Sequence, residues 1–432
     1  MRGAGALGAA SLAPWPTGCS RDQDALTFYF GANPEEAAAR LRVIDVFQRL
    51  HPDIKVRTLL SGMDAMQQMS TYCAGGMCPD VLMSWESHYS VFADRGVLLD
   101  LNTMLAQDKT FAAQLKSESV ASLYDTFTFD GGQYAFPEQW SGNFLFYNKK
   151  LFADAGVPPP PGRWEQPWTF AEFMDTATAL TKRDRSGRVS QWGFVNTWTW
   201  VPYCAAGLFG MNNGASWSSP RMNPTHLNFD NDAFIEGVQF YADLAGKYKV
   251  APTAGETEAQ SVSTTGLFSS GQAAMALGGH WRYQTFDRAD GLDFDVTVLP
   301  TGPRGHAAKS DIGTTGLAIA ASSQRKEQAW EFVKFATGPV GQAVIAESGL
   351  FVPVLRSAIE SPGFAEAHRR IGNLAVLTGG PAHSEGLPIT PQWPEIAALM
   401  DRNVGPVLRG SQPATSLASG LTHEIDKVLR NP

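Results

Sequence analysis

The sequence lacks the short motifs that would identify an enzyme, a metalloprotein or a nucleic-acid-binding protein. It contains no GxSxG, HExxH or P-loop motif, and its eight histidines are spread without metal-ligand spacing. Lysine and arginine are scattered and the net charge is −8, so the chain presents no basic face for nucleic acid. No run of 18 or more apolar residues occurs, so we expect no bilayer-spanning helix. We therefore expect no cofactor, no metal and no nucleic-acid partner.

Cysteine is scarce, and the first of the four cysteines lies in a segment typical of export. One positive charge, Arg2, precedes an apolar stretch of small residues from Gly3 to Ala13. Gly18-Cys19 resembles the bacterial lipobox, in which the cysteine becomes an acylated N-terminus, although Pro16 stands where the lipobox usually has Leu. We expect residues 1–19 to be a signal peptide and Cys19 to carry a lipid. The protein would then be exported and anchored to the outer face of the cytoplasmic membrane.

The remaining cysteines predict one disulfide. Cys73 and Cys78 are separated by Ala-Gly-Gly-Met and lie between a predicted helix and a predicted strand. The glycines allow tight closure, and an exported protein is oxidised. We expect these two to be bonded, the alternative being two free buried thiols. Cys204 would be left as a buried thiol.

Length and composition predict a folded protein of two lobes. At 432 residues the chain is too long for one core, and its 44% apolar and 18% charged residues are typical of a folded soluble protein. Twelve tryptophans and 25 phenylalanines are many for this length. Such rings pack in cores, but tryptophan also supplies flat apolar platforms with one donor at the edge.

The first hundred residues alternate between strands and helices, which predicts an α/β layered sheet with a largely parallel core. A strand over 26–30 is followed by Asn33, a good N-cap, and by Pro34, which suits the first helical position. Ligands of such sheets bind beyond the carboxyl ends of the strands. The residues at that position are Asn33, Ser61, Trp85 and Glu86.

The stretch Tyr134 to Lys149 organises the rest of the chain. Pro137 cannot donate to a sheet, so the strand should end or change sheets there. Polar residues around Trp140 then separate it from a second apolar run, Phe144 to Tyr147. This composition indicates a ligand-facing crossover between two lobes. The alternative is a strand, a loop and a strand in one sheet, with Trp140 simply buried.

Motifs along nearly the whole chain, from Leu26 to about Leu429, carry a family resemblance. They include FQRLHPDIKV, CPDVLMSWE, FADRGVLLDL, GGQYAFP, LFYNKKLFADAGV, LFSSGQAAMALGGHW and SGLFVPVLRSA. In this order they resemble the extracellular solute-binding proteins of ABC importers, and among these the sugar-binding, maltose-binding-protein-like family. The resemblance implies a bilobal α/β periplasmic-binding-protein fold of type II, with two lobes joined by hinge strands.

The resemblance also implies a lobe division and a function. We expect one lobe to take residues 25–137 plus 315–346 and the other 138–314 plus 347–432. A monomer would capture a sugar or sugar-like solute between the lobes and deliver it to the membrane subunits of an ABC permease, without breaking a bond. An exported glycoside hydrolase and a chemosensory binding subunit are the alternatives.

Aromatic and basic residues make up one part of the expected ligand site. Trp281 matches the cleft tryptophan of a Gly-x-Trp motif of the family, after two glycines that permit close backbone approach, and Trp85 matches a tryptophan after a Pro-Asp strand. Arg282 adds a fork that suits phosphate or carboxylate. For Trp198 and Tyr203 the helix they share must also have a core face. The expected ligand-binding residues are Asn33, Ser61, Trp85, Glu86, Glu138, Trp140, Asn143, Trp198, Tyr203, Trp281, Arg282, Asp311 and Thr314.

Carboxylates allow a second interpretation of the same site. Glu86, Glu138 and Asp311 could supply the pair that glycoside hydrolysis needs. In a sugar-binding cleft the same groups accept hydrogen bonds from hydroxyls without catalysis, and the resemblance favours that role.

Overall fold

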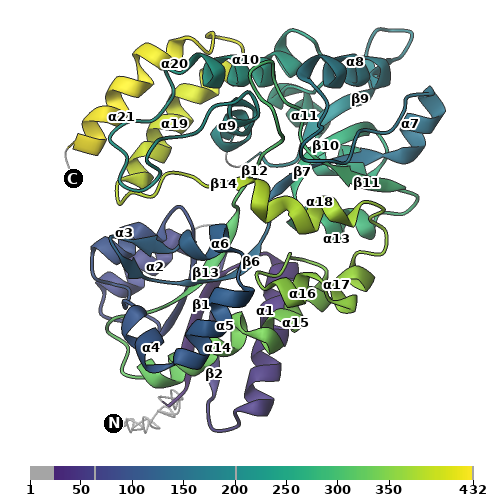
Figure 1. Ribbon diagram of the computed structural model, residues 1–432. Coiled ribbons are helices and arrows are strands. Elements are labelled where there is room, and N and C mark those ends of the chain that lie inside the picture. Colours follow the sequence, from purple (N-terminus) through teal and green to yellow (C-terminus); the bar gives the residue numbers. More distant parts are fainter. Residues whose placement is uncertain (1–23, 63–64, 200–201, 431–432) are drawn as a thin grey trace, which may run out of the picture.

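A computed structural model describes residues 24–62, 65–199 and 202–430 and places them in two lobes, each built on one five-stranded sheet (Figure 1). The expected signal peptide and Cys19 lie outside the described residues. None of the helices in the described ranges is long and apolar enough to cross a bilayer.

The first lobe has its strands in the order β2-β1-β3-β13-β6. They are β1 (Leu26–Gly31), β2 (Val56–Ser61), β3 (Val81–Trp85), β6 (Phe136–Trp140) and β13 (Thr314–Ile319). The first three strands are parallel, as the sequence predicts, whereas β13 runs antiparallel to both its neighbours. It does so because β13 is the return of the chain from the other lobe.

Helices cover both faces of this sheet. They are α1 (Pro34–Leu50), α2 (Ala65–Ala74), α3 (Tyr89–Asp94), α4 (Asn102–Gln107), α5 (Lys109–Glu118), α6 (Ala121–Asp125), α14 (Lys326–Thr337) and α15 (Pro339–Ser348), with a hairpin of β4 (Thr128–Phe129) and β5 (Gly132–Gln133). Successive strand residues point to opposite faces, so Phe28 packs in the core under α1 and α14, and Tyr29 packs in the core under α2 and α3. The short helices α16 (Arg356–Ile359) and α17 (Pro362–Ala367) pack on α15.

The second lobe has its strands in the order β11-β7-β10-β9-β8. They are β7 (Asn143–Asn148), β8 (Lys182–Arg183), β9 (Val189–Asn196), β10 (Ala273–Gly279) and β11 (Phe294–Thr297). Its helices are α7 (Lys149–Ala155), α8 (Phe170–Leu180), α9 (Pro202–Asn212), α10 (Asp232–Gly246), α11 (Ala254–Gln260), α12 (Thr264–Ser269), α13 (Tyr283–Asp287), α18 (Leu374–Gly379), α19 (Trp393–Leu408), α20 (Ser416–Ser419) and α21 (Leu421–Arg430), with the 3₁₀ turns η1 (His280–Arg282) and η2 (Gly380–His383).

Two neighbouring crossovers connect the sheets. One runs from β6 to β7 through Ser141 and Gly142, and the other from β12 (Ser310–Asp311), which pairs with β14 (Ser384–Glu385), to β13. The Ser141 N–H donates to the Gly313 carbonyl at 3.1 Å, and a Cβ on Gly313, whose φ is +45°, would lie 2.9 Å from the Ser141 carbonyl oxygen. The two segments therefore pass close enough to need glycine.

The first sheet extends past Pro137, where the lobe boundary was predicted. β6 continues past Pro137 to Trp140 within the first sheet, so residues 138–140 belong to the first lobe. The strand continues because β6 is the edge strand, and its register with β13 shifts between Thr315 and Gly316, opposite Pro137. Residues 356–367 pack on α15 of the first lobe, and Ala358, Ile359 and Phe364 also share a core with residues of the second lobe.

The start of α1 follows the predicted capping chemistry. Asn33 accepts the N–H of Glu36, and the Glu36 carboxylate accepts the N–H of Asn33, at 2.9 and 3.1 Å. This reciprocal capping box, with Pro34 in the first turn, ends β1 cleanly and begins the helix.

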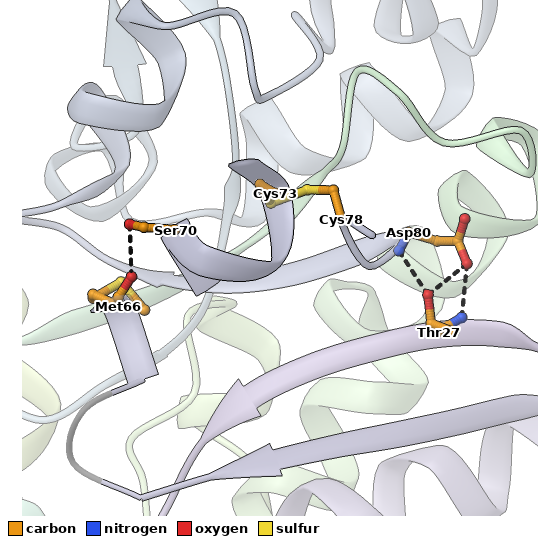
Figure 2. Close-up of a disulfide and its surroundings, with 6 residues drawn as sticks. All are labelled: Thr27, Met66, Ser70, Cys73, Cys78 and Asp80. Atoms are coloured by element: carbon orange, nitrogen blue, oxygen red, sulfur yellow. Dashed lines mark hydrogen bonds between the residues drawn. A yellow bond between two sulfur atoms is a disulfide. The ribbon is translucent and has the colours of Figure 1, made fainter. Parts of the chain in front are cut away.

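Cys73, in the last turn of α2, is bonded to Cys78, just before β3 (Figure 2). The Asp80 carboxylate, two residues further on, accepts hydrogen bonds from the N–H and the hydroxyl of Thr27 at 2.8 and 2.7 Å. The disulfide and Asp80 together hold the α2–β3 connection against β1. Cys204 is a free, buried thiol.

Reduction of the Cys73–Cys78 bond should lower the free energy of unfolding by about 2 kcal/mol, because it releases a closed loop of about six residues in the unfolded chain. Urea unfolding with and without reductant measures this difference. The double variant Cys73→Ser/Cys78→Ser is the control and should not respond to reductant. Equal stability of the native protein in both conditions would show that the bond is absent or without effect.

Candidate functional site

The ends of strands from both sheets meet at the junction of the two lobes. β1 and β3 end there in the first lobe, β9 and β10 end there in the second, and β7 and β13 begin there. Ligands of open α/β sheets bind beyond such strand ends. We therefore examine this junction as the candidate site.

Two tryptophans form an aromatic pair on the second lobe. The rings of Trp198 and Trp281 lie edge to face, with centroids 6.2 Å apart and an interplanar angle of 67°. Trp281 folds back over the end of β10, where a Cβ on Gly279 would lie 1.8 Å from a carbon of its ring. Glycine at 279 is therefore required for this position of the ring. Trp281 retains exposed surface, whereas Trp198 is 8% exposed.

Asn196, at the end of β9, holds the Trp198 side of this pair. Its side-chain carbonyl accepts the N–H of Trp198 at 2.8 Å, and its amide donates to the Trp198 carbonyl and to the Tyr241 hydroxyl at 3.0 and 2.7 Å. Asn196 was not among the residues predicted from the sequence, although it ends a strand that aromatic residues flank, as several of the predicted residues do.

Two carboxylates from different lobes lie near each other at the junction. Burial, together with the charge of Asp311, raises the pKa of Glu86, which follows β3, to about 7. Burial also raises the pKa of Asp311, against the effect of its hydrogen bonds. Burial raises the pKa of the Tyr203 hydroxyl on α9, and the charge of Glu86 makes a small contribution in the same direction. Glu86, Asp311 and Tyr203 thus form a polar cluster at the base of the junction.

Asp311 joins the two crossovers. Its Oδ1 accepts the backbone N–H of Asn143 at 2.9 Å and the Asn143 side-chain amide at 2.8 Å. The Ser310 hydroxyl donates to the Asn143 carbonyl at 2.9 Å. Because Asn143 is completely buried, it supports the hinge and offers no surface to a ligand in this structure.

Arg221 was missed by the sequence analysis, because it lies in a loop without any recognisable motif. Its Nε donates to the Leu387 carbonyl at 2.8 Å, and its Nη1 donates to the hydroxyl of Thr126, in the first lobe, at 3.2 Å. Its charge lowers the pKa of Glu86, partly opposing burial and Asp311. Arg221 therefore links the second lobe to the first and supplies positive charge beside the carboxylates.

Arg282 lies between the aromatic pair and the first lobe. Its Nη2 donates to the Thr197 carbonyl at 2.9 Å. Burial lowers the pKa of Arg282, and the charge of Glu36, on α1 of the opposite lobe, raises it. A carboxylate of the protein thus already lies near this guanidinium, which weakens the expectation of an anionic ligand.

Three other expected site residues make hydrogen bonds within the first lobe. Asn33 is exposed as the cap of α1, and the Ser61 hydroxyl donates to Gln68 at 2.8 Å. Thr314 is fully buried, and its hydroxyl donates to the Gln139 carbonyl at 2.6 Å. These hydrogen bonds support the frame of the first lobe, and contact of the three residues with a ligand stays a prediction.

Glu138 and Trp140 are also internal. Glu138 is 6% exposed and pairs with the buried Arg40, whose Nη2 lies 2.6 Å from its Oε1. Trp140 has no exposed surface and packs edge to face on Phe144, with ring centroids 5.5 Å apart. Trp140 is thus buried, as the simpler alternative expected. The strands on either side of it, β6 and β7, nevertheless lie in different sheets.

Trp85, the remaining expected residue, is half-buried at the end of β3 and packs near His88, with ring centroids 6.1 Å apart. The junction therefore brings together seven of the thirteen expected residues. They are Trp85, Glu86, Trp198, Tyr203, Trp281, Arg282 and Asp311. Within residues 24–62, 65–199 and 202–430, no three side chains are grouped so as to hold a metal ion.

The chain is similar to known proteins over most of its length. The model of the bacterial extracellular solute-binding protein family matches residues 31–343. The chain is 25% identical, over 84% of its length and 78% of the relative, to an uncharacterized lipoprotein of the oleD 5′ region of Streptomyces antibioticus. It is 24% identical, over 85% of its length and 81% of the relative, to the galactooligosaccharide-binding protein of Bacillus subtilis.

Solved structures show the same fold. An ABC substrate-binding protein from Listeria monocytogenes, in complex with cycloalternan, superimposes with a TM-score of 0.81 at 23% identity. The match covers 94% of this chain and 99% of that protein. The fold is therefore the type II periplasmic-binding-protein fold, as expected from the motifs.

Glu86→Gln should stabilise the protein at pH 8 by about 3 kcal/mol, because the native fold holds a buried charge whose pKa lies about 2.5 units above its ordinary value. For an acid with a raised pKa, this cost declines as the pH falls below the native pKa of about 7 and is gone only below the unfolded pKa of 4.5, so the two proteins should converge near pH 4. Chemical unfolding at both pH values measures the effect.

The control for this prediction is Glu360→Gln, a change of the same chemistry at an exposed position. It should leave the stability nearly unchanged at both pH values. Parallel pH curves for Glu86→Gln and the native protein would contradict the prediction.

Proposed function

The chain belongs to the family of bacterial extracellular solute-binding proteins, and from this premise we propose that it captures a neutral sugar between its two lobes and delivers it to the permease of an ABC importer. The family consists of binding proteins, so Glu86 and Asp311 act as hydrogen-bond acceptors and not as a hydrolytic pair. The protein works as a monomer, and its partner is the membrane subunits of the transporter.

The observation that carries this proposal is the meeting of an aromatic pair and a carboxylate pair at one junction. The C–H face of a sugar ring stacks on an aromatic surface such as that of Trp281, and the sugar hydroxyls donate to carboxylates. Relatives described as galactooligosaccharide-, maltotriose- and diacetylchitobiose-binding proteins support a carbohydrate as the solute.

Groups from both lobes are needed for this site. Glu86 comes from the first lobe, Trp198 and Trp281 come from the second, and Asp311 comes from a crossover. A sugar therefore binds the arrangement with the lobes together more tightly than an arrangement with the lobes apart. Binding shifts the hinge equilibrium toward the closed form, which is the form that the permease would recognise.

A thermal-shift screen with maltose, maltotriose, galactooligosaccharides, chitobiose and glycerol phosphodiesters tests the solute class. A true ligand raises the midpoint by mass action, with a gain of about 2.7 kcal/mol at a hundredfold excess over its dissociation constant. A shift with a neutral oligosaccharide supports the proposal. A shift confined to the phosphodiesters would overturn it in favour of an anionic ligand at Arg282.

Trp281→Ala should weaken the binding of the sugar found in this screen by more than tenfold, because truncating a ring at a binding centre costs about 2 kcal/mol or more. Trp330→Phe is the control, since Trp330 is buried in the core of the first lobe beside Phe111 and Phe136. The control should lower the melting temperature and keep the affinity. Calorimetric titration and melting curves of both variants decide between a site and a core role for Trp281.

We also propose that the exported protein is held at the membrane by a lipid on Cys19. Gly18-Cys19 after an apolar segment supports this, as does the relative that is described as a lipoprotein. Cys19→Ser should move the protein from the membrane fraction to the soluble fraction of the cells. Unchanged partitioning, or mass spectra of a mature protein that retains Met1, would count against the anchor.

A further inference from the structure

Two buried histidines contact each other beside the candidate site. His280, in η1 directly before Trp281, has no exposed surface, and His368, which follows α17, is 1% exposed. Their Nε2 atoms lie 2.8 Å apart. The Nδ1 of His280 lies 2.7 Å from the Leu350 carbonyl oxygen, and the Nδ1 of His368 lies 2.8 Å from the Phe364 carbonyl oxygen.

The number of protons on this pair follows from its contacts. A carbonyl oxygen only accepts, so both Nδ1 atoms must carry a proton. The contact between the two Nε2 atoms needs one proton more, donated by one ring to the other. Two neutral imidazoles carry two protons and would bring two lone pairs together, and two imidazolium ions carry four and would bring two N–H groups together. Only three protons, which give the pair a single positive charge, satisfy all three contacts.

We propose that His280 and His368 share one proton between their Nε2 atoms as a singly charged pair, and that this pair positions the η1 turn that presents Trp281 and Arg282. The second part rests on the binding site proposed above, whereas the first part concerns the protein without any solute. His280 and His368 are positioning residues, because neither has surface available to a ligand.

The place of the pair in the fold gives it this role. His280 extends from the end of β10 in the second lobe, and its N–H donates to the Gly142 carbonyl of a crossover at 3.2 Å. Leu350 follows α15, and α17 packs on α15, which itself packs on α1 of the first lobe. Two further bonds follow the same path, from the Tyr283 hydroxyl to the Ala367 carbonyl and from the Gln284 amide to the Ser348 carbonyl, at 3.1 and 2.7 Å. The pair thus fastens the turn carrying Trp281 to the first-lobe helices.

The surroundings oppose any charge on the pair, so the single shared proton is held by the contact between the two Nε2 atoms and by the two backbone carbonyls. Burial lowers the pKa of both histidines, and the charge on His368 lowers the pKa of His280 further, whereas the two backbone carbonyls act in the opposite direction. Asp287 raises the pKa of His368. The charged and titratable groups on the elements packed around the pair are Arg282 of η1, Tyr283 and Asp287 of α13, Glu347 of α15, Glu366 of α17, and Arg369 and Arg370 after it.

A shared proton has a distinctive effect on the pH dependence of folding. An unfolded chain binds two protons on these histidines well below pH 6.5 and none well above it. The native pair holds one throughout, so its contribution to stability rises with pH below about 6.5 and falls with pH above it. A pair that is neutral in the native state would instead contribute stability that rises through this range and then stays constant.

His368→Gln isolates this effect. The glutamine amide can donate to the Nε2 of a neutral His280, so the contact is kept without an extra proton. Unfolding of the native protein and of this variant is measured from pH 5 to pH 9, and one curve is subtracted from the other to remove the other titrating groups, Glu86 included. We expect a difference curve that is flat below about pH 6.5, where the variant gains stability with pH as fast as the native protein does. Above about pH 6.5 the curve should fall, with a slope approaching about tenfold in the unfolding constant per pH unit, because only the native pair releases a proton on unfolding. A curve that rises to a plateau would overturn the shared proton.

¹⁵N spectra of histidine-labelled native protein provide a test that needs no variant. Both Nδ1 atoms of the pair should give shifts typical of protonated nitrogen at pH 7, and both Nε2 atoms should give shifts between those of protonated and unprotonated nitrogen. A shift typical of unprotonated nitrogen at both Nε2 atoms would show a neutral pair and overturn the proposal.

The positioning role is tested by hydrogen exchange without any solute, so its failure is separate from failure of the sugar proposal. His368→Leu removes the partner of His280 and should speed exchange of the amides of residues 280–287 at least tenfold, whereas His368→Gln should leave it near the native rate. If both variants exchange at the native rate in this segment, the pair does not hold the turn. If His368→Leu does not fold, amide exchange of residues 280–287 is measured in the native protein instead. After correction for the intrinsic exchange rate, exchange in this segment should become faster above pH 8. An unchanged corrected rate would overturn the positioning role.

Discussion

The arrangement of the two lobes depends on the bond between Asp311 and Asn143. These residues lie on separate crossovers, 168 positions apart in the chain, and one carboxylate oxygen accepts two N–H groups of the asparagine. A buried carboxylate is costly, and burial raises the pKa of Asp311, but two donors in fixed positions offset that cost. These bonds therefore join the two crossovers side by side between the lobes.

The candidate site follows from this constraint. The crossovers bring the end of β3, with Trp85 and Glu86, opposite the end of β10, with Trp281. Additional contacts between the lobes, from Arg221 to Thr126 and from Asn223 to Asp130, lie outside the hinge. The crossovers therefore determine which residues meet, and these more exposed contacts add links between the lobes away from the crossovers.

Local chemistry explains why much of this could be predicted from the sequence. The cap at Asn33, the strand ends at Trp85 and Trp281, and the bond between Cys73 and Cys78 each involve residues within a few positions of one another. The failures involve partners far along the chain. Glu138 is neutralised by Arg40, 98 residues away, and nothing in the stretch around Trp140 shows that the ring is covered by Gly380. Pro137 was misleading because its effect depends on whether the strand lies at the edge of the sheet.

The close fit of Trp281 over Gly279 also limits how this protein can change over evolutionary time. A side chain at 279 would occupy the space of the ring, so a mutation there moves the tryptophan even when the tryptophan codon is untouched. Conversely, once a lineage replaces Trp281 with a small residue, position 279 is free to vary. Positions 279 and 281 should therefore change together. A relative with a bulky residue at position 279 should lack the aromatic surface that the tryptophan at position 281 forms here.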